Sequence, residues 1–414
     1  MTTVRPFRGL RPSKEYADKV VSLPYDVMNR EEAAKMAEGN PCSFLHISRS
    51  EIDLPDQPDP YDASVYAKAK ENLADFEDKG ILVRDEKPSY YIYKEVMDGR
   101  EQAGIFACAS VDEYEAGIVK RHELTLVAKE IDRINHFDAC DANTEPVFLT
   151  YRDNDELDAL IADEMANSEP LYDVTAADGV EHVLWKVDDE AKVEKIRKLF
   201  EETDALYIAD GHHRTASACK VSKKRREANP GYTGDEESNY VMAAIFPAKS
   251  LKIFDYNRVV KDLNGLSKEE FIDAVKKAGF EVTELGKEQK YPEGKNEFTM
   301  FLDGMWYKLK ATDGIIPKDD PVEALDVSIL QKNLLTPILG IGDPRKDPRI
   351  DFVGGIRGLG ELENRVNKDM KVAFAVYPVD IFDLLDIADK GLIMPPKSTW
   401  FEPKLASGLL VHTF

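Results

Sequence analysis

The sequence predicts an α+β fold with mixed sheets, and three observations support this prediction. Some stretches alternate polar and apolar residues, as strands do, while others repeat apolar residues every three or four positions, as amphipathic helices do. Asp-Gly pairs at 98–99, 178–179 and 303–304 separate strand-like runs, a pattern typical of β-hairpins. Strands and helices also follow one another irregularly, which disfavours a doubly wound parallel sheet.

The composition indicates an acidic protein that folds into more than one domain. The chain has 414 residues, which is more than one simple core supports, and 43% of them are hydrophobic. Its 78 acidic residues outnumber 55 basic ones, giving a net charge of −23. Nucleic acids select basic surfaces, so we expect no nucleic-acid partner.

The cysteines and the apolar runs narrow the class of protein further. Cys42, Cys108, Cys140 and Cys219 form no Cys-x-x-Cys pair, which disfavours a zinc or iron–sulfur framework. The amino-terminal residues lack an apolar signal core, and no run has the length of a membrane span. We therefore expect a cytoplasmic protein without a membrane partner. Nothing in the sequence predicts its oligomeric state.

We expect the chain to divide into three segments. Residues 1–100 form an amino-terminal α+β segment, in which 43–47 alternates like a strand. Residues 101–260 form a core that carries most of the chemistry, and residues 261–414 form a carboxy-terminal α+β domain whose tail is a candidate to return to the site. Near the end of the core, the apolar runs 240–246 and 251–256 are expected to be paired buried strands.

The most informative stretch is 205–217, which reads as a short apolar strand, a turn at Asp210-Gly211 and the start of a helix. A helix N-terminus exposes unpaired N–H groups and the positive end of the dipole, so phosphates bind there readily. Gly211 lets the backbone approach an anion, and Arg214 offers a charged fork to phosphate oxygens. The candidate phosphate- or nucleotide-binding residues of this turn are Gly211, His213, Arg214 and Thr215.

Asp210 and His212 are the candidate catalytic residues of the turn. A carboxylate is electrostatically unsuited to bind phosphate directly, but Asp210 suits Mg²⁺ bound to phosphates, or a base for an attacking hydroxyl. His212 can donate to phosphate or shuttle a proton near neutral pH. Two alternatives stay open at this point: a solvated turn with a helix cap, and a metal site built on the adjacent histidines.

The segment Asp210–Arg214 resembles the phosphate-binding signature of the ParB/sulfiredoxin superfamily, and within it the free-serine kinases, which carry the same five letters. The similarity spans about 100–230. Those kinases have an upstream His-Glu pair whose glutamate activates the serine hydroxyl, and Arg121-His122-Glu123 matches it. The resemblance therefore implies a ParB/sulfiredoxin-like core and Glu123 as a catalytic residue.

The whole chain also resembles the bacterial family filed as domain of unknown function 1015. The segments that carry this resemblance are Arg5–Gly9, Pro24–Val27, Asp210–Arg214, Tyr256–Val260, Leu325–Val327, Met394–Thr399 and Ser407–Gly408. Together the two resemblances imply a phosphotransferase that uses ATP or ADP and Mg²⁺, with free L-serine or O-phosphoserine as the leading small molecule.

Features outside the turn allow more than one interpretation. Two interpretations of Lys397 and Ser398 stay open: they reach the site from the tail to bind phosphate or nucleotide, or they belong to a polar loop. No Gly-rich loop precedes them, so they form no Walker motif. Asp26 lines the site or ends a strand. The basic run 220–226 is interpreted as a solvated helix face that steers anions.

The sequence thus predicts an enzyme that transfers phosphoryl groups between a nucleotide and a small hydroxyl metabolite. Two other functions fit the same turn. A nucleotide-binding switch or adaptor would bind nucleotide tightly with little turnover, and a phosphoserine phosphatase would hydrolyse its substrate with Mg²⁺ alone.

Overall fold

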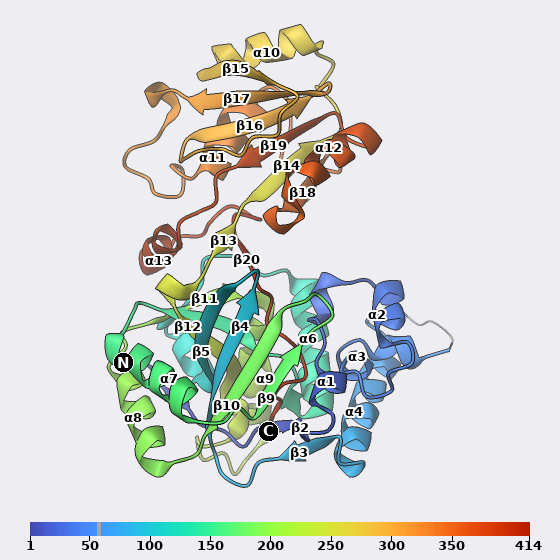
Figure 1. Cartoon of the computed structure of the whole chain (residues 1–414), viewed down its shortest axis with the longest axis vertical. Helices are drawn as coiled ribbons and strands as arrows, with labels where there is room; N and C mark the ends of the chain where they lie inside the picture. The colour runs from blue at the N-terminus through green and yellow to red at the C-terminus, as the bar shows by residue number, and fades with distance from the viewer. Residues whose placement is uncertain (56–58) are drawn as a thin grey trace. The chain divides into compact units, whose positions relative to one another are not determined.

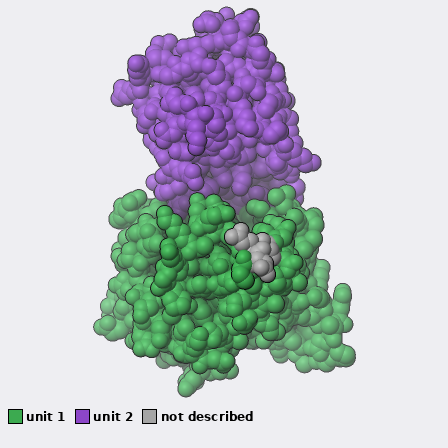
Figure 2. Space-filling model, turned by 90° about the vertical axis from the view of Figure 1, so that its right-hand side faces the viewer, with its two compact units in different colours: residues 1–121, 125–251, 403–414 green, residues 122–124, 252–402 purple. Residues whose placement is uncertain are grey.

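The computed structural model describes residues 1–55 and 59–414 (Figure 1). Their contacts divide the chain into two compact units, coloured separately in Figure 2. Unit 1 comprises Met1–Arg121, Thr125–Leu251 and Pro403–Phe414, and unit 2 comprises His122–Leu124 and Lys252–Glu402. The expected division into three segments at about 100 and 260 stays a prediction, whereas the contacts give two units and join the end of the chain to unit 1.

Unit 1 is built on a nine-stranded mixed sheet, as the sequence predicts for the fold class. The order is β6-β11-β8-β12-β5-β4-β10-β9, and β1 pairs with β5. The pairs β6–β11 and β8–β12 are parallel, whereas the others are antiparallel. The bounds are β1 (Val4–Arg5), β4 (Tyr90–Met97), β5 (Arg100–Ser110), β6 (Val119–Lys120), β8 (Val147–Tyr151), β9 (Tyr172–Thr175), β10 (Glu181–Val187), β11 (Leu206–Asp210) and β12 (Tyr240–Pro247).

One face of this sheet packs against helices. Alternate strand residues such as Ile92, Leu149 and Ile208 point to the same face and form one apolar cluster with Leu157 and Phe200 of the helices. In Figure 1, α7 and α8 lie side by side along this sheet. The helices in this layer are α5 (Val111–Glu115), α6 (Val127–Cys140), α7 (Asp155–Asn167), α8 (Glu190–Glu201) and α9 (His212–Ala228).

The opposite face of the sheet is aromatic and meets the end of the chain. Tyr93 and Phe106 have ring centroids 4.8 Å apart, and those of Phe148 and Phe246 are 5.0 Å apart. The Ala406 amide donates to the Tyr93 hydroxyl at 3.4 Å. The carboxy-terminal segment thereby lies over this face, and it brings Lys404 to the end of β11.

The amino-terminal part of unit 1 adds a smaller helical layer around a second apolar cluster. The predicted strand at 43–47 is wrong, because Leu45–Ser48 forms the short helix α3. Phe44 and Ile47 are both fully buried in this cluster, and their spacing of three is helical rather than alternating. The elements here are β2 (Leu10–Pro12), α1 (Ala17–Val20), η1 (Tyr25–Val27), α2 (Arg30–Ala37), η2 (Ser50–Asp53), α4 (Ala63–Asp78), β3 (Leu82–Arg84), β7 (Ala142–Asn143) and β21 (His412–Thr413).

Unit 2 contains a six-stranded antiparallel sheet in the order β15-β17-β16-β19-β14-β18. Its strands are β14 (Tyr256–Val260), β15 (Phe280–Gly286), β16 (Glu297–Leu302), β17 (Met305–Ala311), β18 (Ile350–Gly354) and β19 (Val372–Val376). Its helices are α10 (Lys268–Lys277), α11 (Asp326–Leu330), α12 (Gly358–Lys368) and α13 (Ile381–Asp389). The hairpin predicted around 303–304 is confirmed as β16–β17.

The predicted pairing of 240–246 with 251–256 is wrong. β12 pairs with β5 and β8 in unit 1, whereas β14 pairs with β18 and β19 in unit 2. Between them, the two-residue strand β13 (Ile253–Phe254) pairs with β20 (Trp400–Phe401). The two apolar runs serve different cores, and composition alone does not distinguish that arrangement from a hairpin.

Among the helices that the structure describes, none combines the length and the apolarity needed to cross a membrane.

Candidate functional site

The turn at Asp210–Gly211 has the predicted strand–turn–helix geometry. β11 ends at Asp210, Gly211 adopts a left-handed conformation with φ 91°, and α9 starts at His212. A Cβ on Gly211 would lie 3.1 Å from Nε of Arg214. Thr215 donates its hydroxyl to the Gly211 carbonyl at 3.1 Å, which fixes the first turn of α9. The glycine is therefore needed both for its φ angle and for the close approach of Arg214.

Arg214 lies beneath the turn rather than in solvent. Its side chain is 4% exposed, and one terminal nitrogen donates to the carbonyl of Pro146. Burial tends to lower the pKa of Arg214, but the charges of Asp26 and Asp210 raise it above its usual value. Arg214 is consequently a fixed positive charge, with no freedom to move to a distant ligand.

Asp210 is held ionised at the end of β11. Its Oδ2 lies 3.1 Å from Nζ of Lys404, and its Oδ1 accepts the Gly211 N–H at 2.8 Å. Burial alone would raise the pKa of Asp210, but the charges of Lys404 and Arg214 hold it well below its usual range. A carboxylate with a low pKa is a weak general base at neutral pH, so the geometry favours a metal ligand over a base.

The two adjacent histidines differ in their surroundings. Nε2 of His213 accepts the backbone N–H of Leu126 at 2.9 Å. Burial lowers the pKa of His213, and the nearby charge of Lys129 lowers it further. A neutral His213 therefore carries its proton on Nδ1, where it can donate to an anion. His212 begins α9 and is 5% exposed.

Glu145 is a buried acid that no sequence pattern singles out. It precedes β8, is 1% exposed, and accepts the hydroxyl of Ser407 at 3.2 Å. Its other oxygen, Oε2, is shielded from solvent and has no hydrogen-bond partner among the described residues. Burial raises the pKa of Glu145 to about 7, although Arg214 and Arg133 act in the opposite direction. This carboxyl group accordingly titrates near neutral pH.

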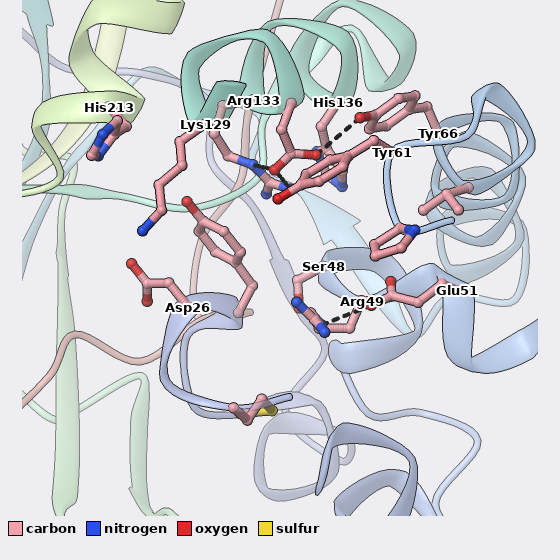
Figure 3. Close-up of a pocket in the computed structure, with 15 residues that line it drawn as sticks. Asp26, Ser48, Arg49, Glu51, Tyr61, Tyr66, Lys129, Arg133, His136 and His213 are labelled. Carbon is pink, nitrogen blue, oxygen red and sulfur yellow. Dashed lines mark hydrogen bonds and ion pairs between the residues drawn. The ribbon is translucent and has the colours of Figure 1, made fainter. Parts of the chain in front are cut away.

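A polar cavity of about 230 Å³ adjoins the turn through His213 (Figure 3). Its walls come from η1, the α3–η2 region, α4, α6 and α9, all in unit 1. Arg133 is 5% exposed, pairs with Asp132 at 2.8 Å and stacks 3.9 Å over the ring of Tyr25. Its lining includes Tyr25, Asp26, Arg49, Glu51, Tyr61, Tyr66, Lys129 and Arg133.

The remaining predicted site residues, Glu123, Lys397 and Ser398, belong to unit 2. The amide of Met394 donates to the carbonyl of His122 at 2.8 Å, so unit 2 brings the His122-Glu123 pair and the tail together. Ser398 donates its hydroxyl to the carbonyl of Pro395 at 2.6 Å, and Lys397 lies 5.4 Å over the ring of Tyr256. That these residues act with the Asp210 turn stays a prediction.

The basic run on α9 does not form the anion-steering face that its charges suggest. Each basic residue of the run has an acidic partner, so the face carries little net positive charge. The pairs are Lys220–Glu130, Lys223–Glu115, Lys224–Asp138, Arg225–Asp141 and Arg226–Asp112.

Several residues around the turn were missed or undervalued by sequence reasoning. Lys129 and Arg133 lie four residues apart on α6 and line one side of the cavity, a spacing visible in the sequence. Asp26, left open between two interpretations, also lines the cavity and acts on Arg214 through its charge. Lys404 had no local signal, because its partner lies 194 residues away.

Solved structures that match the chain do so at low sequence identity and with low TM-scores. A free serine kinase in complex with AMP is 13% identical, with a TM-score of 0.37 over 74% of this chain and 91% of that one. A conserved hypothetical protein from Pyrococcus furiosus is 15% identical, with a TM-score of 0.36 over 73% and 95%. SbnI from Staphylococcus aureus, with a C-terminal truncation, is 11% identical, with a TM-score of 0.39 over 74% and 86%.

No curated protein matches the chain. The family model described as protein of unknown function (DUF1015) matches residues 4–328. That match covers most of unit 1, which carries the Asp210 turn, and most of the sequence segments that carry the resemblance. The chain therefore belongs to the DUF1015 family.

Proposed function

We propose that the chain is a nucleotide-dependent phosphotransferase for a small hydroxyl metabolite, with free L-serine and O-phosphoserine as the first candidates. One observation carries the proposal: a helix N-terminus with an ionised Asp210 and a buried, charged Arg214 lies beside a polar cavity. Phosphoryl transfer needs positioning and stabilisation of charge more than covalent chemistry, and this arrangement supplies both.

The residues of the turn divide the work. The N–H groups at the start of α9 and the Nδ1–H of His213 hold the transferring phosphate, and Arg214 stabilises its charge from beneath. His212 donates a further hydrogen bond or carries a proton. The sequence resemblance supports a ParB/sulfiredoxin-like core around the turn, with Glu123 activating the acceptor hydroxyl. Lys397 and Ser398 contact the nucleotide from the tail.

Asp210 fits the Mg²⁺ that ATP or ADP brings with it. Mg²⁺ prefers oxygen ligands and keeps several waters, so one carboxylate and the nucleotide phosphates are enough. The Asp210 side chain is ionised and 34% exposed, which leaves room for a hydrated cation. Because Lys404 pairs with Oδ2, the metal would share or displace that contact. When bound, Mg²⁺ would neutralise charge on the phosphates.

The test is an assay of labelled ATP and ADP with Mg²⁺ and a panel of hydroxyl-bearing metabolites that includes L-serine. We expect nucleotide-dependent formation of a phosphorylated product, and a loss of about 10²-fold or more in Asp210→Asn. Lys195→Met is the control, because Lys195 is exposed on α8, outside the turn and the cavity lining. Tight nucleotide binding without turnover would indicate a switch instead. Hydrolysis of phosphoserine with Mg²⁺ alone would indicate a phosphatase.

A further inference from the structure

The cavity beside the turn has paired charges on its walls and two unpaired charges near His213. Arg49 lies 2.9 Å from Glu51, and Arg133 lies 2.8 Å from Asp132, so these pairs are locally neutral. Lys129 and Asp26 also line the cavity, yet neither takes part in an ion pair within the described part of the chain. The cavity therefore presents one free charge of each sign to whatever enters it.

These two charges come from different elements of unit 1. Lys129 comes from α6 and Asp26 from η1, and Figure 3 shows their charged ends pointing to the same part of the cavity, beside His213. Both side chains are exposed, so they can adjust to a ligand. A molecule that carries an anionic and a cationic group close together would satisfy both at once.

A third group also lacks a partner. Nη1 of Arg133 is shielded from solvent and has no hydrogen-bond partner among the described residues. The residue as a whole is 5% exposed. Buried guanidinium N–H groups are normally satisfied, and an acceptor oxygen in the cavity would satisfy this one. This adds a donor on the α6 side, where Lys129 already supplies a positive charge.

Size limits the ligand further. The cavity measures about 230 Å³, whereas pockets that enclose drug-sized ligands start at about 300 Å³. A whole nucleotide belongs to the larger class, so the cavity suits a smaller molecule of amino-acid size. Tyr25, Tyr61 and Tyr66 supply hydroxyl groups and ring edges around it, which suits a polar ligand with a short side chain.

We propose that this cavity is the acceptor pocket and that it recognises the zwitterionic head of a small α-amino acid. Lys129 and Arg133 hold the carboxylate, and Asp26 holds the ammonium group. The side-chain hydroxyl then points towards His213 and the phosphate turn. The assignment as an acceptor pocket rests on the proposed phosphotransferase function, whereas the recognition of a zwitterion rests on the cavity alone.

Binding is measured by calorimetry on the full chain, with and without ADP and Mg²⁺, using three probes of similar size. L-serine carries both charges, ethanolamine lacks the carboxylate, and glycerate lacks the ammonium group. We expect L-serine to bind at least about tenfold more tightly than either of the others. Equal binding of all three probes, or no binding of L-serine at millimolar concentration in either condition, overturns the proposal.

Variants give a crossed pattern that a loss of folding cannot imitate. Lys129→Met should weaken L-serine and glycerate about tenfold and leave ethanolamine unchanged, while Asp26→Asn should weaken L-serine and ethanolamine and leave glycerate unchanged. Both residues are exposed, so both variants should fold. Lys195→Met, an exposed helical lysine outside the cavity, should change none of the three. Equal losses for all three probes in either variant contradict the assignment.

The two proposals fail separately. If the crossed binding pattern is found but no bound compound is phosphorylated, the zwitterion pocket stands and the phosphotransferase fails. If phosphoryl transfer to an amino acid occurs with a KM that neither variant changes, the function stands and the pocket assignment fails. Displacement of L-serine by AMP in a Lys129-dependent manner would identify the cavity as a nucleotide site and overturn the assignment.

Discussion

Glu145→Gln should make unit 1 more stable at alkaline pH and remove part of its pH dependence. Glutamine has nearly the same shape as a protonated glutamate and, like it, carries no charge. Burial raises the pKa of Glu145 from 4.5 to about 7, so below that pH the folded protein holds this side chain neutral. The variant therefore resembles the form that the fold prefers, and it lacks the charged form that burial disfavours.

The sign and the size follow from the two pKa values. Between pH 4.5 and about pH 7, Glu145 has lost its proton in the unfolded chain but keeps it in the folded chain. The free energy of unfolding therefore falls as the pH rises. The slope is about 1.4 kcal/mol per pH unit, and it levels off above the folded pKa. Between about pH 5.5 and pH 8.5, the variant should gain about 2 kcal/mol on the wild type.

Hydrogen exchange of peptides from β8 and α9 reports the stability of unit 1 separately from that of unit 2. Comparing variant and wild type at the same pH cancels the intrinsic pH dependence of exchange. The control is Glu130→Gln, at another buried acid of unit 1. Burial acts to raise the pKa of Glu130, but its contacts with Lys220 and Thr125 hold it below the usual value. That variant should be less stable by a constant amount over this range.

The reasoning about Glu145 is refuted by a difference between Glu145→Gln and wild type that stays constant from about pH 5.5 to pH 8.5. Such a result would mean that the carboxylate is already ionised throughout, because Arg133 and Arg214 outweigh its burial. A variant that is less stable than the wild type by the same amount at every pH would lead to the same conclusion.

Three further predictions concern the turn and the tail. Lys404→Met should destabilise unit 1 by about 1 kcal/mol at pH 7, since the pair with Asp210 is partly exposed. Because the pKa of Asp210 is depressed, this loss should shrink as the pH falls below about 4. Urea unfolding at several pH values measures both effects. Gly211→Ala should cost about 1–2 kcal/mol in backbone strain and also displace Arg214, which lowers both the melting temperature and the nucleotide affinity. The control is Gly234→Ala, at φ 99° in open space, which should show the strain without the loss of nucleotide affinity. Lys397→Gly should stabilise unit 2 by up to about 1 kcal/mol, because Lys397 has φ 58°. A simultaneous loss of phosphoryl transfer would support its predicted contact with nucleotide, and unchanged transfer would remove it from the site.

Local patterns were sufficient for much of the fold. The alternation and the Asp-Gly pairs predicted the β4–β5 and β16–β17 hairpins, since a tight turn and its flanking strands are specified within a few residues. The same holds for the strand–turn–helix around Asp210, where Gly211 supplies the conformation that the turn requires. The helix at 45–48 and the separation of β12 from β14 were missed, because both depend on which core surrounds a short apolar run.

The sequence by itself therefore determined the mixed α+β class, the family resemblance and the strand–turn–helix from Asp210 to Arg214. The tertiary structure decided the charge state of that turn, because the groups that set it come from distant parts of the chain. Lys404 meets Asp210 across 194 residues, and Ser407 meets Glu145 across 262. Burial and charge pairing act through space, so the ionised Asp210, the titrating Glu145 and the cavity around Arg133 appear only once the chain is folded.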